Sequence, residues 1–421
     1  MTVSLYRGFY SENGRLLSIT HSQVKMKYQI LIVGGGNAGL STASKLLLKN
    51  PKLEIGIIEP SEKHYYQPAW TLVGGGTYDI ADTVRDEVDF IPKGAVWIKD
   101  AVATFQPEVN TVTTREGKTI SYDYLVVCPG IQLNWNQVEG LPETLGKNGV
   151  CSNYTFQTAP YTFECLKNLE SGTAIFTAPG TAVKCGGAPQ KIMYLAADYL
   201  RKNGRADKVK VEFCTAGGVI FGIEKYAKTL RKVVERYKID TQFKHDLIRV
   251  DGPAHQATFR VTAADGTVTE ETRHFDMLHI TPPQSAPDFV RNSPLANAAG
   301  WIDVDKFTLR HNKYPNVFGI GDASGAPNSK TGAAVRKQAP VLVENLLAVM
   351  AGKTPAARYN GYSSCPIVTG YGKLMLAEFD YDNKPTETFP FDQSKERWTM
   401  WMLKRYMLPW LYWNKILNGA M

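Results

Sequence analysis

The sequence predicts an α/β protein with two tandem Rossmann-like (three-layer) domains and a C-terminal membrane-associating helical segment. Three observations lead to this prediction. Apolar strands alternate with helical stretches over most of the 421 residues, which is enough chain for two or three domains. A glycine-rich turn follows the first of these strands. Four of the eight tryptophans fall in the last 24 residues.

The glycine-rich turn is the strongest local signal. The apolar residues 30–33 predict a buried parallel strand, and three glycines follow in G-x-G-x-x-G register before a helix over 41–49. In this pattern the glycines permit a tight turn, a close approach to a pyrophosphate and close packing of helix on strand. A second strand over 54–58 is followed by a glutamate that is placed for the ribose hydroxyls of an adenosine. The residues predicted to bind this dinucleotide are Gly34, Gly36, Asn37, Ala38, Gly39 and Glu59.

Loops at the carboxyl ends of the following strands are expected to meet a flavin. The polar and aromatic loop 64–70 contributes Gln67 to the cofactor site. A strand is predicted over 96–102, and its last residue, Val102, either lines the adenine or is plain core.

The next stretch predicts a hairpin and a glycine turn. Residues 111–114 and 119–121 form the hairpin, and a strand over 124–127 leads into Cys128-Pro129-Gly130. Gly130 is expected to touch the flavin. Cys128 stands where dinucleotide-binding flavoproteins commonly carry a small residue, and we interpret it as a packing residue.

A second α/β unit is expected from residue 172 onward, with strands over 174–177 and 209–214 and helices over 190–202 and 225–237. The loop 178–189 lacks the G-x-G-x-x-G triplet that would seat NAD(P)H. The fold can therefore persist without a nicotinamide site, which argues against a pyridine-nucleotide-dependent reductase. A strand over 275–282 leads out of this unit, and we expect its His279 to be a core histidine.

A third cluster of predicted cofactor residues lies near residue 320. An apolar strand is predicted within 317–322 and ends in Gly-Ile-Gly-Asp, whose aspartate is placed for a ribityl chain. The helix predicted over 331–350 would aim the positive end of its dipole at the flavin and stabilise an anionic reduced form. Lys330 adds a full charge there or is a solvated lysine. The predicted contacts are Gly321, Asp322, Lys330, Thr331, Gly332 and Ala333.

Composition and cysteine spacing exclude several functions. The net charge of +8 reflects surface lysines or attraction to an anionic membrane. No basic run interleaves with aromatic residues, so we expect no nucleic acid partner. The six cysteines lack C-x-x-C spacing, which argues against a secreted disulfide framework and a zinc site, and we expect no metal. No run of 18 apolar residues is present to span a membrane.

The C-terminal residues combine tryptophan, leucine and methionine with Lys395, Arg397, Lys404, Arg405 and Lys415. This mixture predicts short amphipathic helices, interrupted by a proline at 409, that lie in a membrane interface. The alternative is a helix pair that covers a core or a dimer interface, so a homodimer stays open.

The predicted domain ranges follow from these signals. They are a disordered or targeting tail over 1–26, a flavin-binding dinucleotide domain over 27–145 and 286–352, a second Rossmann-like domain over 146–285, and a membrane-docking region over 353–421. The family resemblance described next implies that the first of these domains binds FAD and that the region 353–421 gives access to a quinone.

Several stretches together resemble the sulfide:quinone oxidoreductases, in particular the mitochondrial-type branch of this two-dinucleotide-binding-domain flavoprotein family. They are HYYQPAWTLVG, VCSNY, VKCGGAPQKIMY, MLHITPP, SCPIVTGY and ETFPFDQSKER, besides the two glycine turns. The resemblance implies that FAD is bound without a second nucleotide. It also implies that Cys185 and Cys365 form the catalytic redox pair at the flavin, and that Cys151 is outside this pair.

The same resemblance implies the partners. Hydrogen sulfide is oxidised, its sulfur passes to a small thiol or sulfite (glutathione, sulfite or coenzyme A), and electrons pass to ubiquinone. The protein would be a peripheral, monotopic protein of a bacterial cytoplasmic membrane, or of the mitochondrial inner membrane if eukaryotic. The alternatives are a type II NADH:quinone oxidoreductase and a non-catalytic membrane-docked flavoprotein.

The residues around Cys185 agree with a reactive thiol. Cys185 precedes two glycines and Pro189, which suits the first turn of the following helix. A helix N-terminus and the neighbouring Lys184 should lower the pKa of the Cys185 thiol. Cys365 and Pro366 are expected in a short loop ahead of an antiparallel stretch over 371–381.

Overall fold

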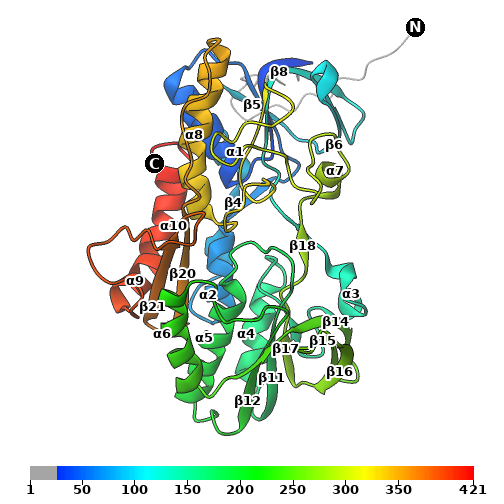
Figure 1. Ribbon diagram of the computed structural model, residues 1–421, viewed down its shortest axis with the longest axis vertical. Coiled ribbons are helices and arrows are strands. Elements are labelled where there is room, and N and C mark those ends of the chain that lie inside the picture. Colours follow the sequence, from blue (N-terminus) through cyan, green and yellow to red (C-terminus); the bar gives the residue numbers. More distant parts are fainter. Residues whose placement is uncertain (1–25) are drawn as a thin grey trace, which may run out of the picture.

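A computed structural model describes residues 26–421 of the chain. The tail predicted for 1–26 falls, apart from Met26, outside the described residues. Two α/β lobes are stacked along the long axis, and the C-terminal helices lie on one side near the level where the lobes meet (Figure 1).

The first lobe is built on a seven-stranded sheet in the order β5-β2-β1-β8-β7-β6, with β19 also paired to β8. Strands β1, β2, β5, β8 and β19 are parallel, whereas β6 and β7 are antiparallel additions. The strands are β1 Lys27–Val33, β2 Ile55–Ile58, β5 Ala95–Ile98, β6 Val102–Gln106, β7 Thr111–Thr114, β8 Thr119–Val127 and β19 Val317–Gly319. Helices α1 Asn37–Lys49 and α8 Gly332–Met350 accompany this sheet.

Both faces of β1 are buried, as its apolar run predicts. Ile30 and Ile32 pack with α1 and α8, while Leu31 and Val33 belong to a core cluster on the opposite face. A strand covered on both faces reads as a continuous apolar run, which explains why the sequence identified it.

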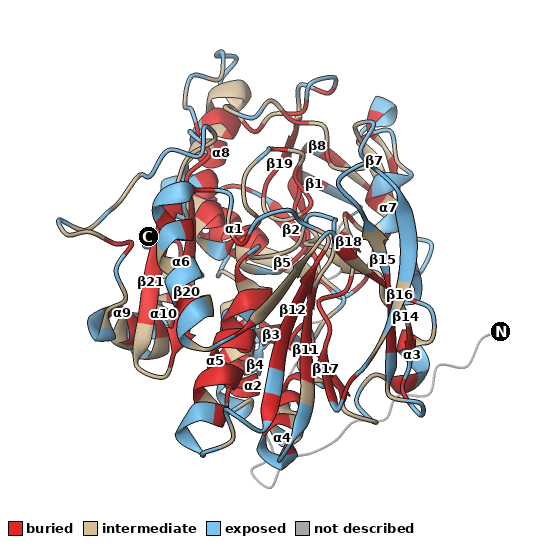
Figure 2. Ribbon diagram, turned by 60° about the horizontal axis from the view of Figure 1, so that its bottom comes forward, coloured by how far each residue is buried: buried red, intermediate tan, exposed pale blue. Residues whose placement is uncertain are grey.

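The second lobe contains a five-stranded parallel sheet in the order β10-β17-β11-β12-β13. Its central strands are buried, and helices lie over them (Figure 2). The elements are β10 Val150–Cys151, α4 Ala159–Asn168, β11 Gly172–Ala178, α5 Ala188–Lys202, β12 Val209–Thr215, α6 Glu224–Arg236, β13 Asp240–Phe243 and β17 Met277–His279. A three-stranded antiparallel sheet, which the sequence analysis does not predict, is formed by β14 His245–Asp251, β15 Gln256–Thr262 and β16 Val268–His274.

Short elements connect the lobes. Strand β18 Gln284–Ser285 pairs with β9 Gln132–Leu133 where the chain crosses between the lobes. Other short elements before residue 300 are β3 Lys63–Tyr65, α2 Trp70–Gly74, β4 Val84–Asp86, α3 Leu141–Thr144 and α7 Asp288–Arg291, and several 3₁₀ turns that include Gln67–Ala69.

Two predicted strand boundaries are wrong. The strand predicted over 96–102 is divided, because β5 ends at Ile98 and β6 starts at Val102 with antiparallel pairing. The strands predicted over 119–121 and 124–127 are one continuous strand, β8, because β7 pairs with its first part and β1 with the rest.

The predicted loop at Cys365 is a strand. Cys365 lies in β20 Ser363–Gly370, opposite Ala377 of β21 Lys373–Phe379. Pro366 is tolerated in this position because a two-stranded hairpin leaves unpaired strand edges, where a missing N–H costs little. The hairpin packs on α5 and so carries Cys365 to the second lobe.

The C-terminal segment is helical from Trp398 to Ile416 without a break at Pro409. It comprises α9 Trp398–Met402, a π-helical turn Leu403–Met407, α10 Leu408–Leu411 and a π-helical turn Tyr412–Ile416. The predicted interruption at Pro409 is therefore wrong, since π-helical turns flank the proline and absorb the irregular hydrogen bonding. In the part of the chain that the structure describes, no helix has the length and apolar character needed to cross a membrane.

Candidate active site

Cys185 and Cys365 meet at the N-terminus of α5. Their sulfur atoms lie 3.5 Å apart, and both are free thiols. Gly187 makes this approach possible, because a Cβ atom there would lie 2.5 Å from the sulfur of Cys365. From the sequence, only the family resemblance pairs these cysteines, and the fold brings them together from positions 180 residues apart.

The backbone of Cys185 is strained. Its φ of +54° lies in the left-handed region, which a residue with a Cβ adopts at a cost of about 1–3 kcal/mol. Two hydrogen bonds hold the turn: the Cys185 N–H donates to the Lys330 carbonyl over 2.7 Å, and the Ala188 N–H donates to the Cys185 carbonyl over 2.7 Å. Strain of this kind is typical of functional sites.

The two thiols have opposite electrostatic environments. The Lys191 ammonium, buried on α5, donates a hydrogen bond to the Cys185 sulfur over 2.9 Å. The hydrogen bond from Cys365 and the charge of Lys191 hold the pKa of Cys185 well below its ordinary value, although burial opposes this. The same contact with Cys185, together with burial, raises the pKa of Cys365 well above its ordinary value. Cys185 is therefore the thiolate of the pair.

Lys191 was not identified from the sequence. Burial lowers the pKa of Lys191, but the Cys185 thiolate more than compensates and raises it to about 12. Lys191 therefore stays charged over the physiological pH range. A lysine in the apolar register of a helix that follows a cysteine is the signal that could have revealed it, since a buried lysine needs an anionic partner.

Lys404 reaches the same place from the C-terminal segment. Its side chain is buried, with 3% exposure, and its ammonium donates to the Pro68 carbonyl over 2.8 Å. Burial and the charge of Lys191 lower the pKa of Lys404 to about 7. The prediction that Lys404 is one of the cations of a membrane-facing surface is wrong, because its side chain is buried in the protein.

The glycine-rich turn forms the first wall of the predicted cofactor site. Gly34 has a φ of +106°, and a Cβ atom at Gly39 would lie 1.8 Å from the Gly34 carbonyl oxygen. In contrast, a Cβ atom at Gly36 would meet nothing within 4 Å, so this position faces open space at the start of α1. The Glu59 carboxylate accepts hydrogen bonds from the N–H groups of Gly35 (2.8 Å) and Ser61 (2.7 Å), which leaves lone pairs for other donors.

The turn before α8 forms the second wall. A Cβ atom at Gly321, where φ is +75°, would lie 3.2 Å from the Ala38 Cβ, and one at Gly332 would lie 3.5 Å from the Asn37 amide nitrogen. Thr331 caps α8 by accepting a hydrogen bond from Ala334 over 3.1 Å, while Ala333 packs on the core of the first lobe. Two helix N-termini therefore meet here, which suits anionic phosphate and a reduced flavin.

Charged side chains line the space between these walls. Burial raises the pKa of the Asp322 carboxyl, whereas the charges of Lys330 and Lys184 act to lower it. Burial lowers the pKa of Lys330 to about 8, opposed by Asp322, and its ammonium donates to the Ser324 carbonyl (2.9 Å). Lys330 is buried and therefore not a solvated lysine. The Lys184 ammonium donates to Gln67 over 2.6 Å.

Of the other predicted residues, Gly130 follows Pro129, which borders Gly34, whereas the rest are core or inert side chains. Val102 packs in a core cluster of the first lobe, and Gly130, with a φ of +79°, has open space at its Cβ position. Burial raises the pKa of Cys128 strongly, so this thiol packs and does not react. Burial lowers the pKa of His279 to about 3, as expected for a neutral core histidine. Cys151 is buried in the core of the second lobe.

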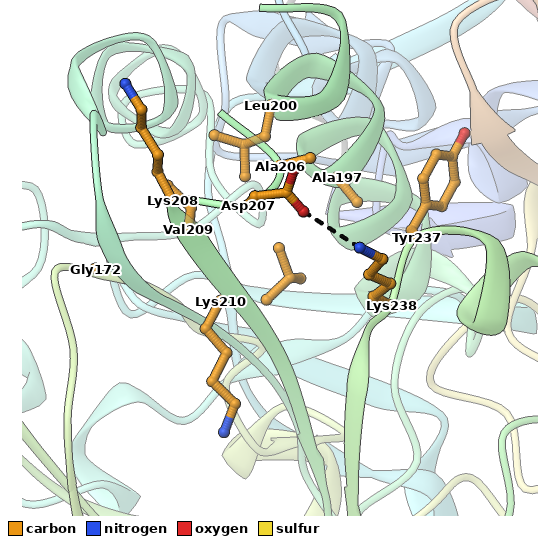
Figure 3. Close-up of a pocket in the computed structure, with 11 residues that line it drawn as sticks. Gly172, Ala197, Leu200, Ala206, Asp207, Lys208, Val209, Lys210, Tyr237 and Lys238 are labelled. Carbon is orange, nitrogen blue, oxygen red and sulfur yellow. Dashed lines mark hydrogen bonds and ion pairs between the residues drawn. The ribbon is translucent and has the colours of Figure 1, made fainter. Parts of the chain in front are cut away.

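Another pocket lies near the other end of α5 and has no catalytic character. Its volume is about 270 Å³, and its lysines diverge: Lys208 and Lys210 point away from each other, and Lys238 pairs with Asp207 over 3.2 Å (Figure 3). Among residues 26–421, no group of three or more histidine, cysteine, aspartate or glutamate side chains is arranged to hold a metal ion.

We expect Gly36→Ala to weaken FAD binding by at least about tenfold without destabilising the apoprotein. The new methyl group meets no protein atom but occupies the space through which a pyrophosphate approaches α1. Fluorescence titration with FAD and thermal unfolding of the apoprotein measure the two effects. Gly39→Ala is the comparison, because its methyl group collides with the Gly34 carbonyl and should lower the unfolding temperature. Equal FAD affinity in Gly36→Ala and wild type would contradict the prediction that a pyrophosphate approaches α1 at Gly36.

Comparisons with known proteins show the family of the chain. Residues 28–340 match the family model of pyridine nucleotide-disulphide oxidoreductases. The mitochondrial sulfide:quinone oxidoreductase of Dictyostelium discoideum is 50% identical over 400 residues, covering 94% of this chain and 87% of that protein. The one of Mus musculus is 46% identical over 395 residues, with the same coverage of both chains.

A solved structure supports the fold. The sulfide:quinone oxidoreductase of Aquifex aeolicus superposes with a TM-score of 0.78 over 93% of this chain and 91% of that chain, at 22% identity. Identity this low shows a shared fold only, whereas the closer relatives and the family model show the family. The chain therefore belongs to the sulfide:quinone oxidoreductases, which are FAD-dependent members of the pyridine nucleotide-disulphide oxidoreductase family.

Proposed function

We propose that this chain oxidises hydrogen sulfide at Cys185 and Cys365 and passes the electrons through FAD to ubiquinone. The observation that carries the proposal is a pair of thiols 3.5 Å apart, one held as a thiolate by Lys191, on a turn hydrogen-bonded to the loop before α8. FAD supplies a two-electron carrier between the thiol pair and the quinone. In this proposal the first lobe holds FAD, the second lobe supplies Cys185, and the C-terminal region supplies Cys365 and quinone access.

The difference in pKa between the two thiols determines which of the two sulfurs sulfide attacks. In the oxidised enzyme the two sulfurs are bridged, and sulfide opens the bridge by bonding to one of them. The better leaving group is the sulfur with the lower thiol pKa, which is Cys185 beside Lys191. Sulfide therefore attacks Cys365, which becomes a persulfide, while Cys185 leaves as a thiolate stabilised by Lys191.

The spacing is compatible with two forms of the bridge. A direct S–S bond of about 2.05 Å requires the sulfurs to move about 1.5 Å closer than the observed 3.5 Å. One additional sulfur atom between them requires little movement. The persulfide formed on Cys365 is a source of such an atom.

A cavity beside the cysteine turn suits the sulfur acceptor. Its volume is about 480 Å³, and Gly186, Gln190 and Phe379 are among its lining residues. It lies at the carboxyl ends of β11 and β12, where a Rossmann domain with the glycine triplet would bind a nucleotide. We propose that a small thiol or sulfite approaches the pair from here and removes the sulfane sulfur.

The outer face of the C-terminal helices supports docking on a membrane. Trp398, Tyr406, Met407 and Trp410 are exposed on this segment, while its other residues hold it to α1 through bonds such as Ser44 Oγ to the Leu417 carbonyl (2.7 Å). Exposed aromatic and apolar side chains beside cations are typical of interfacial helices. The mitochondrial relatives favour the mitochondrial inner membrane over a bacterial membrane.

We expect the double substitution Met407→Ser and Trp410→Ser to lower partitioning into vesicles of phosphatidylcholine and phosphatidylglycerol roughly tenfold, because it removes exposed apolar surface. Vesicle cosedimentation measures the effect. The matched control is Val109→Ser, which removes an apolar side chain that is 67% exposed on the first lobe. If vesicle binding is unchanged and a dimer dissociates instead, this face is an interface between copies of the chain.

The experiment that tests the function is anaerobic stopped-flow absorbance of the FAD-loaded protein. Sulfide should bleach the flavin rapidly, and a short-chain ubiquinone should restore it. Bleaching by NADH with no response to sulfide would instead support an NADH:quinone oxidoreductase. A flavin that neither donor reduces would support a non-catalytic flavoprotein.

A further inference from the structure

The C-terminal helix contributes a second buried lysine to the thiol pair. Lys404 and Lys191 are 3% and 4% exposed, and they come from elements more than 200 residues apart in the sequence. Lys191 is bonded to the Cys185 sulfur, and the charge of Lys404 interacts with Lys191 and with both cysteines. The hydrogen bond recorded for the Lys404 ammonium goes to a neutral acceptor, the Pro68 carbonyl, at 2.8 Å.

The groups that face Lys404 define its charge balance. They are Lys191 on α5, Cys185 in the preceding turn and Cys365 on β20, and the ring of Tyr66 lies 6.0 Å away. Burial keeps the Tyr66 phenol neutral by raising its pKa far above the ordinary value. No carboxylate is among the groups recorded as acting on the Lys404 charge. The charge that can neutralise Lys404 is therefore that of the Cys185 thiolate, because Cys365 stays a neutral thiol.

We propose that Lys404 is the proton acceptor of the thiol pair: it is neutral when the sulfurs are bridged and takes up a proton when the bridge opens. This inference rests on the proposed function, since it concerns the same pair of cysteines. It assigns a proton-transfer role to a residue of the segment that the sequence predicts for membrane docking and quinone access.

The sulfide step balances with this assignment. H₂S, the bridged pair and the neutral Lys404 amine give a Cys365 persulfide, a Cys185 thiolate and the Lys404 ammonium. One S–S bond forms between the sulfide sulfur and Cys365, and the bond from Cys365 to Cys185 breaks with the electron pair going to Cys185. Of the two protons of H₂S, one stays on the persulfide and the other moves to Lys404.

The same charges explain why the pKa of Lys404 rises when the sulfur bridge opens. Burial and Lys191 disfavour the charged form of Lys404 in both states, but the Cys185 thiolate favours it only when the bridge is open. The pKa of Lys404 is about 7 beside the thiolate and falls when the thiolate is lost. Lys191 cannot take this role, since its pKa of about 12 keeps it protonated throughout.

The pH dependence of the reduction potential of the pair tests the proposal without using sulfide. The FAD-loaded protein is equilibrated anaerobically in dithiothreitol redox buffers, trapped with a maleimide and scored by mass spectrometry. Reduction to one thiol and one thiolate takes up one proton, which shifts the potential by about 30 mV per pH unit. With a second proton on Lys404 we expect the slope to steepen toward about 59 mV per pH unit as the pH falls through about 7.

Substitutions of Lys404 distinguish a role in proton uptake from a purely structural role. Lys404→Met and Lys404→Arg should both keep about 30 mV per pH unit, because neither side chain exchanges a proton in this range. Lys415→Met, which removes an exposed lysine of the same segment, should behave like wild type. A wild-type slope that stays near 30 mV, or a steep slope that survives in Lys404→Arg, would overturn the proposal. Failure of sulfide to bleach the flavin would overturn the proposed function instead, whatever the slope.

Discussion

Cys185→Ser is expected to abolish flavin bleaching by sulfide, with a loss of at least about 10³-fold in the rate constant. The hydroxyl of serine cannot form the sulfur bridge that sulfide opens, and it cannot leave as a stable anion beside Lys191. FAD binding should be unchanged, because Cys185 contacts the loop before α8 through its backbone N–H, which serine retains. Anaerobic stopped-flow absorbance near the flavin maximum measures the rate.

The matched control is Cys165→Ser. Cys165 is a partly buried thiol on α4 that packs on the core of the second lobe and makes no hydrogen bond to Cys185 or Cys365. Its substitution should leave the rate within about threefold of wild type. Sulfide-driven bleaching that persists in Cys185→Ser would mean that the flavin is reduced without the pair, and the proposed chemistry would be wrong.

Lys191→Met is expected to slow the alkylation of Cys185 by iodoacetamide roughly tenfold or more at pH 7 in the reduced protein. The substitution removes the ammonium that lies 2.9 Å from the Cys185 sulfur, so the pKa of the thiol rises and less thiolate is present at pH 7. Well above the new pKa both proteins carry a thiolate, and their rates should converge. Sulfide oxidation should slow as well, because Cys185 becomes a poorer leaving group.

The convergence at high pH distinguishes an electrostatic role from a structural one. A collapsed or displaced cysteine turn would leave the alkylation slow at every pH. Lys202→Met is the matched control, since it removes a half-exposed lysine from the other end of α5. If Lys191→Met and wild type react equally fast at pH 7, the thiolate is stabilised by another group and the assignment of Lys191 fails.

The dinucleotide fold could be predicted from the sequence because its signals are local. The run at residues 30–33 is apolar throughout since both faces of β1 are covered, and Gly39 must be glycine since a Cβ atom would strike the Gly34 carbonyl. The predicted ends of α1, α5 and α8 agree with the observed ends to within a few residues, because the signals that begin and end a helix are also local. The division between β5 and β6 could not be predicted in this way. One strand ends and the next begins because their pairing partners differ, and these partners are distant in the sequence.

By itself, the sequence determined the strand-turn-helix unit of the first lobe, the loss of the nicotinamide triplet and, through family resemblance, the pair Cys185 and Cys365. Only the tertiary structure decided which cysteine is the thiolate and which lysines serve the pair. No local pattern marks Lys404 as buried, and the apolar register that contains Lys191 does not reveal its partner, since most lysines lie on the surface. Their roles arise because α5, β20 and the C-terminal helix converge on the sulfurs, where burial makes each charge depend on its neighbours.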